Sequence, residues 1–127
     1  MKGLYLSIGF GGVLAFLGTG LYMAMHFPAA YAASEEIRYM YRANHVYLLL
    51  ASLINLAVGI YWTGLRTGWR GTLAGVGTWF LFAAPLVLLY AFFFEASHGM
   101  PERVLTLLGV AMLLAGVLAQ WPNRVRR

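Results

Sequence analysis

The sequence predicts an all-α integral membrane protein, folded as a single antiparallel bundle of four transmembrane helices joined by short loops. Hydrophobic residues make up 61% of the 127 residues and charged residues only 10%, whereas a soluble domain has about 25% charged residues. Four apolar stretches are each long enough to supply the ~20 residues that cross a ~30 Å hydrocarbon core. The expected helices cover residues 4–26, 34–64, 71–94 and 101–121.

The first expected helix, residues 4–26, is apolar apart from two hydroxyl side chains. Small residues recur at every fourth position and predict a strip for close helix packing, namely Ser7, Gly11, Ala15 and Thr19. Pro28 is expected to end this helix. The segment Ala30-Tyr31-Ala32 also fits a signal-peptide cleavage site. The preceding apolar run, however, exceeds the ~7–15 residues usual in signal peptides, which favours a retained helix.

The second expected helix, residues 34–64, is the longest. Ser34 is placed to cap its first turn, and Glu35 and Glu36 oppose the helix dipole there. A helix of this length measures about 46 Å, so its start is expected to protrude beyond the ~30 Å core on the outer side. Its polar and small residues share one face that is expected to meet protein rather than lipid, namely Arg38, Arg42, His45, Ser52, Asn55 and Gly59.

The third and fourth expected helices carry further boundary and packing signals. Pro85 lies within the third helix, where it removes one backbone hydrogen bond and predicts a kink. Pro101 and Glu102 favour the start of the fourth helix, and Pro122 favours its end. Small residues predict close packing of both helices, at Gly71 and Gly75 in the third and at Ala111, Ala115 and Ala119 in the fourth.

Basic residues are unevenly divided between the two sides of the predicted bundle. With four crossings, both termini and the link between the second and third helices share one side. That side holds six basic residues and no acidic one, namely Lys2, Arg66, Arg70, Arg124, Arg126 and Arg127. The other side holds three, namely Arg38, Arg42 and Arg103. The positive-inside rule therefore predicts a bacterial-type inner (plasma) membrane protein with both termini in the cytoplasm.

The outer side gathers a candidate ligand or ion site, made of His26, His45, His98, Glu35, Glu36, Glu95, Glu102, Arg38 and Arg42. Three interpretations stay open. The first is a solvated rim of paired charges. The second is a metal site of His26, His45 and His98, or a haem held by two of them. The third is a pathway for a proton, ion or small solute, or a quinone-like headgroup site, lined by His45, Ser52 and Asn55, although hydrogen bonding between helices is favoured for the last two.

Catalytic signatures are missing from the sequence. There is no Cys, which excludes disulfides and cysteine nucleophiles, and no G-x-S-x-G, H-E-x-x-H or phosphate-loop motif occurs. Small-residue strips are abundant, so the expected function is a non-enzymatic packing or accessory subunit. It would self-associate or join a larger membrane complex within the lipid bilayer. No cofactor is the first expectation, with a metal or haem as the alternative. Because the basic residues are scattered at segment ends, nucleic acid is not an expected partner.

Overall fold

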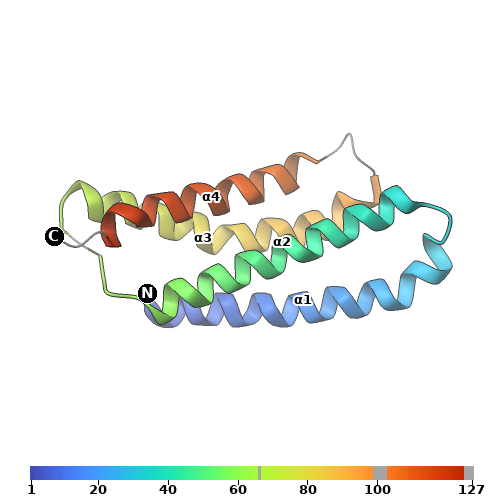
Figure 1. Ribbon diagram of the computed structural model, residues 1–127, viewed down its shortest axis with the longest axis horizontal. Coiled ribbons are helices and arrows are strands. Elements are labelled where there is room, and N and C mark those ends of the chain that lie inside the picture. The colour runs from blue at the N-terminus through green and yellow to red at the C-terminus, as the bar shows by residue number, and fades with distance from the viewer. Residues whose placement is uncertain (66, 99–102, 125–127) are drawn as a thin grey trace.

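The computed structural model describes residues 1–65, 67–98 and 103–124. These residues form four long helices, α1 (Lys2–Ala30), α2 (Glu35–Ile60), α3 (Trp69–Phe94) and α4 (Val104–Arg124), and a short 3-10 helix, η1 (Ala96–His98) (Figure 1). Each long helix contains a stretch long and apolar enough to cross a membrane. The all-helical prediction is therefore confirmed, and the helices are those of a multi-pass membrane protein.

Consecutive helices run in opposite directions and lie along the long axis of the molecule (Figure 1). α1 packs mainly on α2, α3 packs mainly on α4, and α2 and α3 join the two pairs. α1 and α4 lie on the outside of this arrangement. The interior is therefore built around the contact between α2 and α3.

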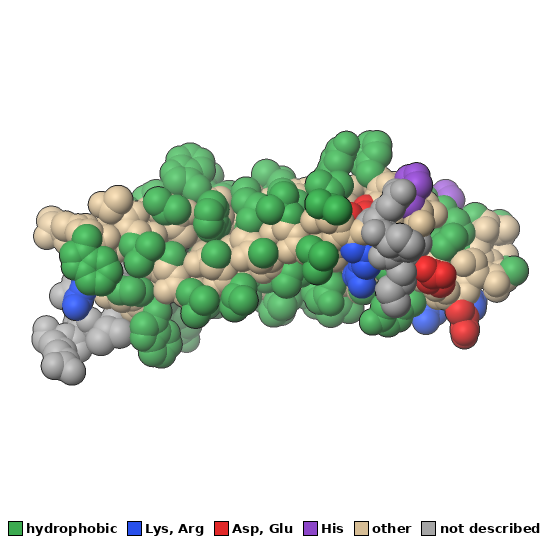
Figure 2. All heavy atoms as spheres, turned by 90° about the horizontal axis from the view of Figure 1, so that it is seen from above, with side chains coloured by type: hydrophobic (Ala, Val, Ile, Leu, Met, Phe, Trp, Pro, Cys, Tyr) green, Lys and Arg blue, Asp and Glu red, His purple; other side chains and the backbone are tan. Residues whose placement is uncertain are grey.

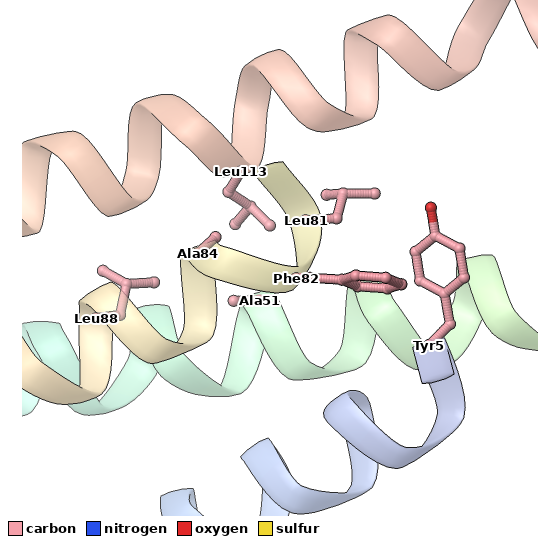
Figure 3. Close-up of a cluster of buried hydrophobic side chains, with 7 residues drawn as sticks. All are labelled: Tyr5, Ala51, Leu81, Phe82, Ala84, Leu88 and Leu113. Atoms are coloured by element: carbon pink, nitrogen blue, oxygen red, sulfur yellow. The ribbon is translucent and has the colours of Figure 1, made fainter. Parts of the chain in front are cut away.

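The central hydrophobic cluster unites side chains from all four helices (Figure 3), namely Tyr5, Ala51, Leu81, Phe82, Ala84, Leu88 and Leu113. Within it, the rings of Tyr5 and Phe82 lie edge to face with centroids 4.6 Å apart. A second cluster contains Tyr41 and Phe92, whose rings also meet edge to face, at 5.0 Å. Aromatic pairs of this geometry contribute about 0.5–1.5 kcal/mol beyond their buried area. Large rings thus hold the helices together in both clusters.

Helix α2 begins as predicted and ends earlier. The Ser34 hydroxyl accepts a hydrogen bond from the N–H of Ile37 at 3.4 Å, which confirms the cap. The helix ends at Ile60, and the connection to α3 includes Gly64 and Gly68 with φ of 90° and 77°, a conformation that glycine adopts readily. α2 therefore has 26 residues, as many as α3. The prediction that it is the longest helix is wrong. At 1.5 Å per residue α2 measures about 39 Å, so it exceeds a ~30 Å core by less than predicted, and its protrusion stays a prediction.

Two prolines lie inside helices whose ends they were expected to mark. Pro28 is in the last turn of α1, which continues to Ala30, and Pro122 is in the last turn of α4. Proline lacks an N–H, but a later residue can still close the turn. The N–H of Tyr31 donates to the carbonyl of Phe27 at 3.2 Å. With 29 residues, α1 is the longest helix.

The remaining helix boundaries differ from the prediction by a few residues. α3 begins at Trp69 and contains Pro85, as expected, whereas the kink at this proline stays a prediction. α4 begins at Val104. Pro101 and Glu102, which were expected to form its first turn, lie outside the described residues.

Close packing of α3 on α4 uses one small residue that was predicted, Ala119, and two that were not, Gly77 and Gly116. A Cβ atom at Gly77 would lie 2.6 Å from the Cβ of Ala119 and 2.9 Å from the carbonyl oxygen of Gly116. Gly71 is buried, but a Cβ atom at Gly75 would have nothing within 4 Å. The other two members of the predicted strip on α4, Ala111 and Ala115, are exposed, so the strip as a whole does not lie in this contact.

The members of the predicted strip on α1 do not all lie on the face that packs within the chain, although Thr19 is buried and contacts His45 of α2. Residues four apart drift by about 40° per step around a helix of 3.6 residues per turn, so a strict fourth-residue strip leaves the contact face. Ser7 and Gly11 are exposed. α1 instead packs on α2 through Gly9 and Gly12, where an added Cβ would overlap Leu56 and Ser52.

Paired glycine substitutions test this packing. Gly77→Ala is expected to lower the free energy of unfolding by about 1–3 kcal/mol, because the added methyl forces α3 from α4. The matched variant Gly75→Ala places its methyl in open space and is expected to leave stability unchanged or to raise it by up to about 1 kcal/mol. Reversible unfolding in mixed micelles measures both values. An equal change in the two variants would contradict the observed contact.

Candidate functional site

Most of the ionisable side chains that the sequence singled out lie at one end of the molecule, here called the polar end. It contains the end of α1, the first turns of α2, the end of α3 with η1, and the start of α4. Figure 2 shows charged and histidine side chains gathered there, beyond a middle section covered by hydrophobic side chains. Several of them are exposed, namely His26, Glu35, Glu36, Arg42 and His98. Glu102 lies outside the described residues.

Glu95 is the exception, because its side chain is only 6% exposed. One carboxylate oxygen accepts a hydrogen bond from the N–H of Leu105 at 2.8 Å. The other accepts from the N–H of Thr106 at 2.7 Å and from the Thr106 hydroxyl at 2.6 Å. The first N–H groups of a helix have no partner inside the helix, and a negative charge there opposes the dipole. Glu95 therefore caps α4 from the end of α3.

Asn44 of α2 extends this cap to a third helix. Its amide is fully buried and its oxygen position lies 2.9 Å from the Thr106 hydroxyl. That hydroxyl has one proton, and it cannot donate to both Asn44 and Glu95. Exchanging the amide O and N of Asn44 lets its NH₂ donate to Thr106, which then donates to Glu95. This orientation also gives a partner to the amide nitrogen, which otherwise has none.

Arg38 and Arg103 each bury part of a guanidinium group at the polar end. Nε of Arg38 and both Nε and Nη2 of Arg103 are enclosed and make no hydrogen bond within the described part of the chain. Neither side chain forms an ion pair with a described residue. The polar end therefore retains unused donor capacity on these two cations.

The three histidines each have separate local partners. His26 stacks on Tyr22 with ring centroids 4.1 Å apart. His45 Nδ1 lies 2.8 Å from the Thr19 hydroxyl, and its ring also stacks on a phenylalanine of α1. His98 Nδ1 lies 3.3 Å from the hydroxyl of its neighbour Ser97. In the described ranges no group of three or more His, Cys, Asp or Glu side chains is placed to hold a metal ion. The structure therefore does not bring the histidines together.

The two intramembrane polar residues of α2 make structural hydrogen bonds. Asn55 is fully buried, and its NH₂ donates to the carbonyl of Leu81 on α3 at 2.8 Å and to that of Ala51 at 2.9 Å. Within α3 the Leu81 carbonyl would accept from residue 85, which is proline and has no N–H. Asn55 thus supplies the donor that Pro85 lacks. Ser52, also buried, donates within its own helix to the carbonyl of Leu48 at 2.6 Å.

A third buried polar group, which the sequence reading missed, joins α1, α3 and α4. The Gln120 NH₂ donates to the Ala74 carbonyl at 2.9 Å and to the Tyr5 hydroxyl at 3.0 Å. Tyr5 in turn donates to the Thr78 hydroxyl at 2.7 Å, and Thr78 donates to the Ala74 carbonyl at 2.8 Å. Polar side chains at Thr78 and Gln120 within otherwise apolar helices were the available signal.

Comparison with known protein families, with curated proteins and with solved structures finds no match to this chain. The function must therefore be argued from the geometry of the chain itself. That geometry shows buried polar side chains that connect helices.

The Glu95 cap gives a direct test. Glu95→Gln replaces one acceptor oxygen by an NH₂ group, which then faces the N–H groups of α4 or the Thr106 hydroxyl. The first turn of α4 is expected to open, with loss of about 1–3 kcal/mol of local stability and at least about five-fold faster amide exchange at Leu105 and Thr106. Hydrogen exchange followed by mass spectrometry measures this effect.

The matched control is Glu35→Gln, which changes an exposed carboxylate in the first turn of α2. It is expected to leave exchange in α4 unchanged. If Glu95→Gln also leaves the protection of Leu105 and Thr106 unchanged, Glu95 does not hold the start of α4.

Proposed function

We propose that this chain is a non-enzymatic packing subunit of a bacterial-type inner (plasma) membrane, with both termini in the cytoplasm, that self-associates through α1. The uneven distribution of basic residues supports this orientation. Exposed aromatic side chains near the proposed cytoplasmic boundary, namely Tyr61, Trp69 and Trp121, fit a membrane interface at this end, because such rings favour both interfaces.

The observation that carries the proposal is an exposed stripe along α1. Its members alternate at spacings of three and four residues, and all of them are exposed: Leu4, Ser7, Gly11, Leu14, Gly18, Leu21 and Met25. This is the heptad spacing by which two helices pack side by side. Leucines can serve as knobs and the small residues as holes. We call these seven residues the α1 stripe.

The glycines of the α1 stripe have no packing role within the chain. A Cβ atom at Gly11 or Gly18 would have nothing within 4 Å. Glycine in a helix is about 1 kcal/mol less favourable than alanine. Inside a membrane, small residues instead favour association because they let two helices approach closely. The stripe is self-complementary, so a second copy of the chain is the proposed occupant.

The rival functions receive less support. A solute pathway requires polar side chains that remain available to a solute, whereas Ser52 and Asn55 are fully buried and donate to backbone carbonyls. A metal site of three histidines requires converging ligands, and the described residues contain no group of three His, Cys, Asp or Glu side chains placed for a metal. For a haem held by two histidines, the local contacts of each ring offer no positive support. Packing in the membrane is the role that best accounts for the exposed α1 stripe.

Single cysteines test the proposal directly, because the natural sequence contains none. Leu14→Cys and Gly18→Cys lie on the α1 stripe, whereas Phe10→Cys and Leu17→Cys are matched controls at residues of similar exposure, 60% and 59%, beside it. Oxidation in native membranes is expected to give disulfide-linked dimers several-fold more efficiently at the stripe positions, where the two helices approach most closely.

Two other results are informative. Equal or absent crosslinking at all four positions would contradict self-association through α1. A crosslinked product whose mass exceeds that of a dimer, and which contains a different protein, would retain the accessory role but replace the second copy by another subunit.

A further inference from the structure

We infer that a groove between α2 and α4 binds an uncharged, single-chain lipid-like alcohol. The groove encloses a cavity of about 330 Å³, which falls within the range of small-molecule sites. Its walls include Ala57 and Tyr61 at the end of α2, and Val117, Gln120 and Trp121 on α4. This inference is independent of the α1 stripe and of the proposed self-association.

Gln120 supplies the one hydrogen-bonding feature on which the inference depends. Its side chain is only 4% exposed. Its NH₂ group donates to the carbonyl of Ala74, and a carbonyl can only accept, so the orientation of the amide is determined. The oxygen of the amide therefore points away from this network. Within the described residues no donor reaches it.

We place this oxygen at the edge of the groove. It is not one of the fully enclosed atoms that lack a partner, so it keeps some accessible surface, and Gln120 lines the cavity. Because the side chain is almost fully buried, its acceptor has lost most of its contact with water and gained no donor in exchange. A ligand with an O–H group would restore that bond.

The rest of the groove determines the other properties of the ligand. None of the residues that line it carries a formal charge, so a charged head group would lose its hydration without compensation. Tyr61 and Trp121 are 68% and 71% exposed, as expected for amphipathic rings at a membrane interface. An alcohol head at Gln120 with one apolar chain extending between α2 and α4 satisfies both constraints.

A pair of photoreactive probes tests this recognition on the unmodified protein. One probe is a long-chain alcohol with a diazirine in its chain, and the other is its methyl ether, which has the same chain and no donor. In lipid nanodiscs the alcohol is expected to label the peptides of the groove about five-fold more than the ether, the ratio given by one net hydrogen bond. Mass spectrometry of the labelled peptides gives this ratio.

Two variants test the location of the site. Ala57→Phe places a large ring in the groove at a residue that is not itself a hydrogen-bond partner of Gln120, and it is expected to abolish the preference for the alcohol. Val46→Phe, at an exposed position of α2 outside the groove, is expected to retain it. Equal labelling by alcohol and ether would show ordinary lipid packing and overturn the inference. Undiminished preference in Ala57→Phe would do the same.

Discussion

The carbonyl of Leu81, deprived of its helical donor by Pro85, is the constraint on which the middle of the structure depends. Inside a membrane no water can replace that donor, and an unpaired backbone group costs several kcal/mol. The buried amide of Asn55 provides the missing N–H at 2.8 Å. This bond joins α2 to α3 and so joins the two helix pairs, α1–α2 and α3–α4. A proline that would weaken an isolated helix thereby specifies where its neighbour docks.

The same principle recurs at both ends of the molecule. Gln120 and its partners connect α1, α3 and α4 near the chain termini, and Glu95 caps α4 and meets α2 at the polar end. Three groups of buried hydrogen bonds thus set the register of four helices whose apolar side chains alone would pack in many ways. Because these side chains form hydrogen bonds between helices, the interior serves cohesion. The α1 stripe and the groove between α2 and α4 are the features left for other molecules.

Much of the fold could be predicted from the sequence. The thickness of the membrane sets the length of each apolar helix, and the need to pair every backbone N–H and C=O inside the membrane requires such segments to be helical. The four helices, the Ser34 cap and the inward face of Asn55 follow from local rules. The packing surfaces could not be predicted in this way. A strip of small residues does not determine how a helix is rotated about its axis, and the contact between Gly77 and Gly116 exists only once α3 is docked on α4. The link between Asn55 and Pro85 could not be predicted from the sequence either. Both residues were singled out, but their pairing depends on the axial position of α2 relative to α3. Glu95 was grouped with surface charges, since only the three-dimensional path of the chain returns it to the start of α4.

The most direct test of this account is a double-mutant cycle between Asn55 and Pro85, measured as the free energy of unfolding in mixed micelles. Asn55→Leu is expected to destabilise the natural protein by about 1–2 kcal/mol. In the Pro85→Ala background, residue 85 regains an N–H that can bond the Leu81 carbonyl, so the same substitution should have much less effect, with a coupling energy of about 1 kcal/mol. An equal effect of Asn55→Leu in both backgrounds would show that the two residues act independently and would contradict the account.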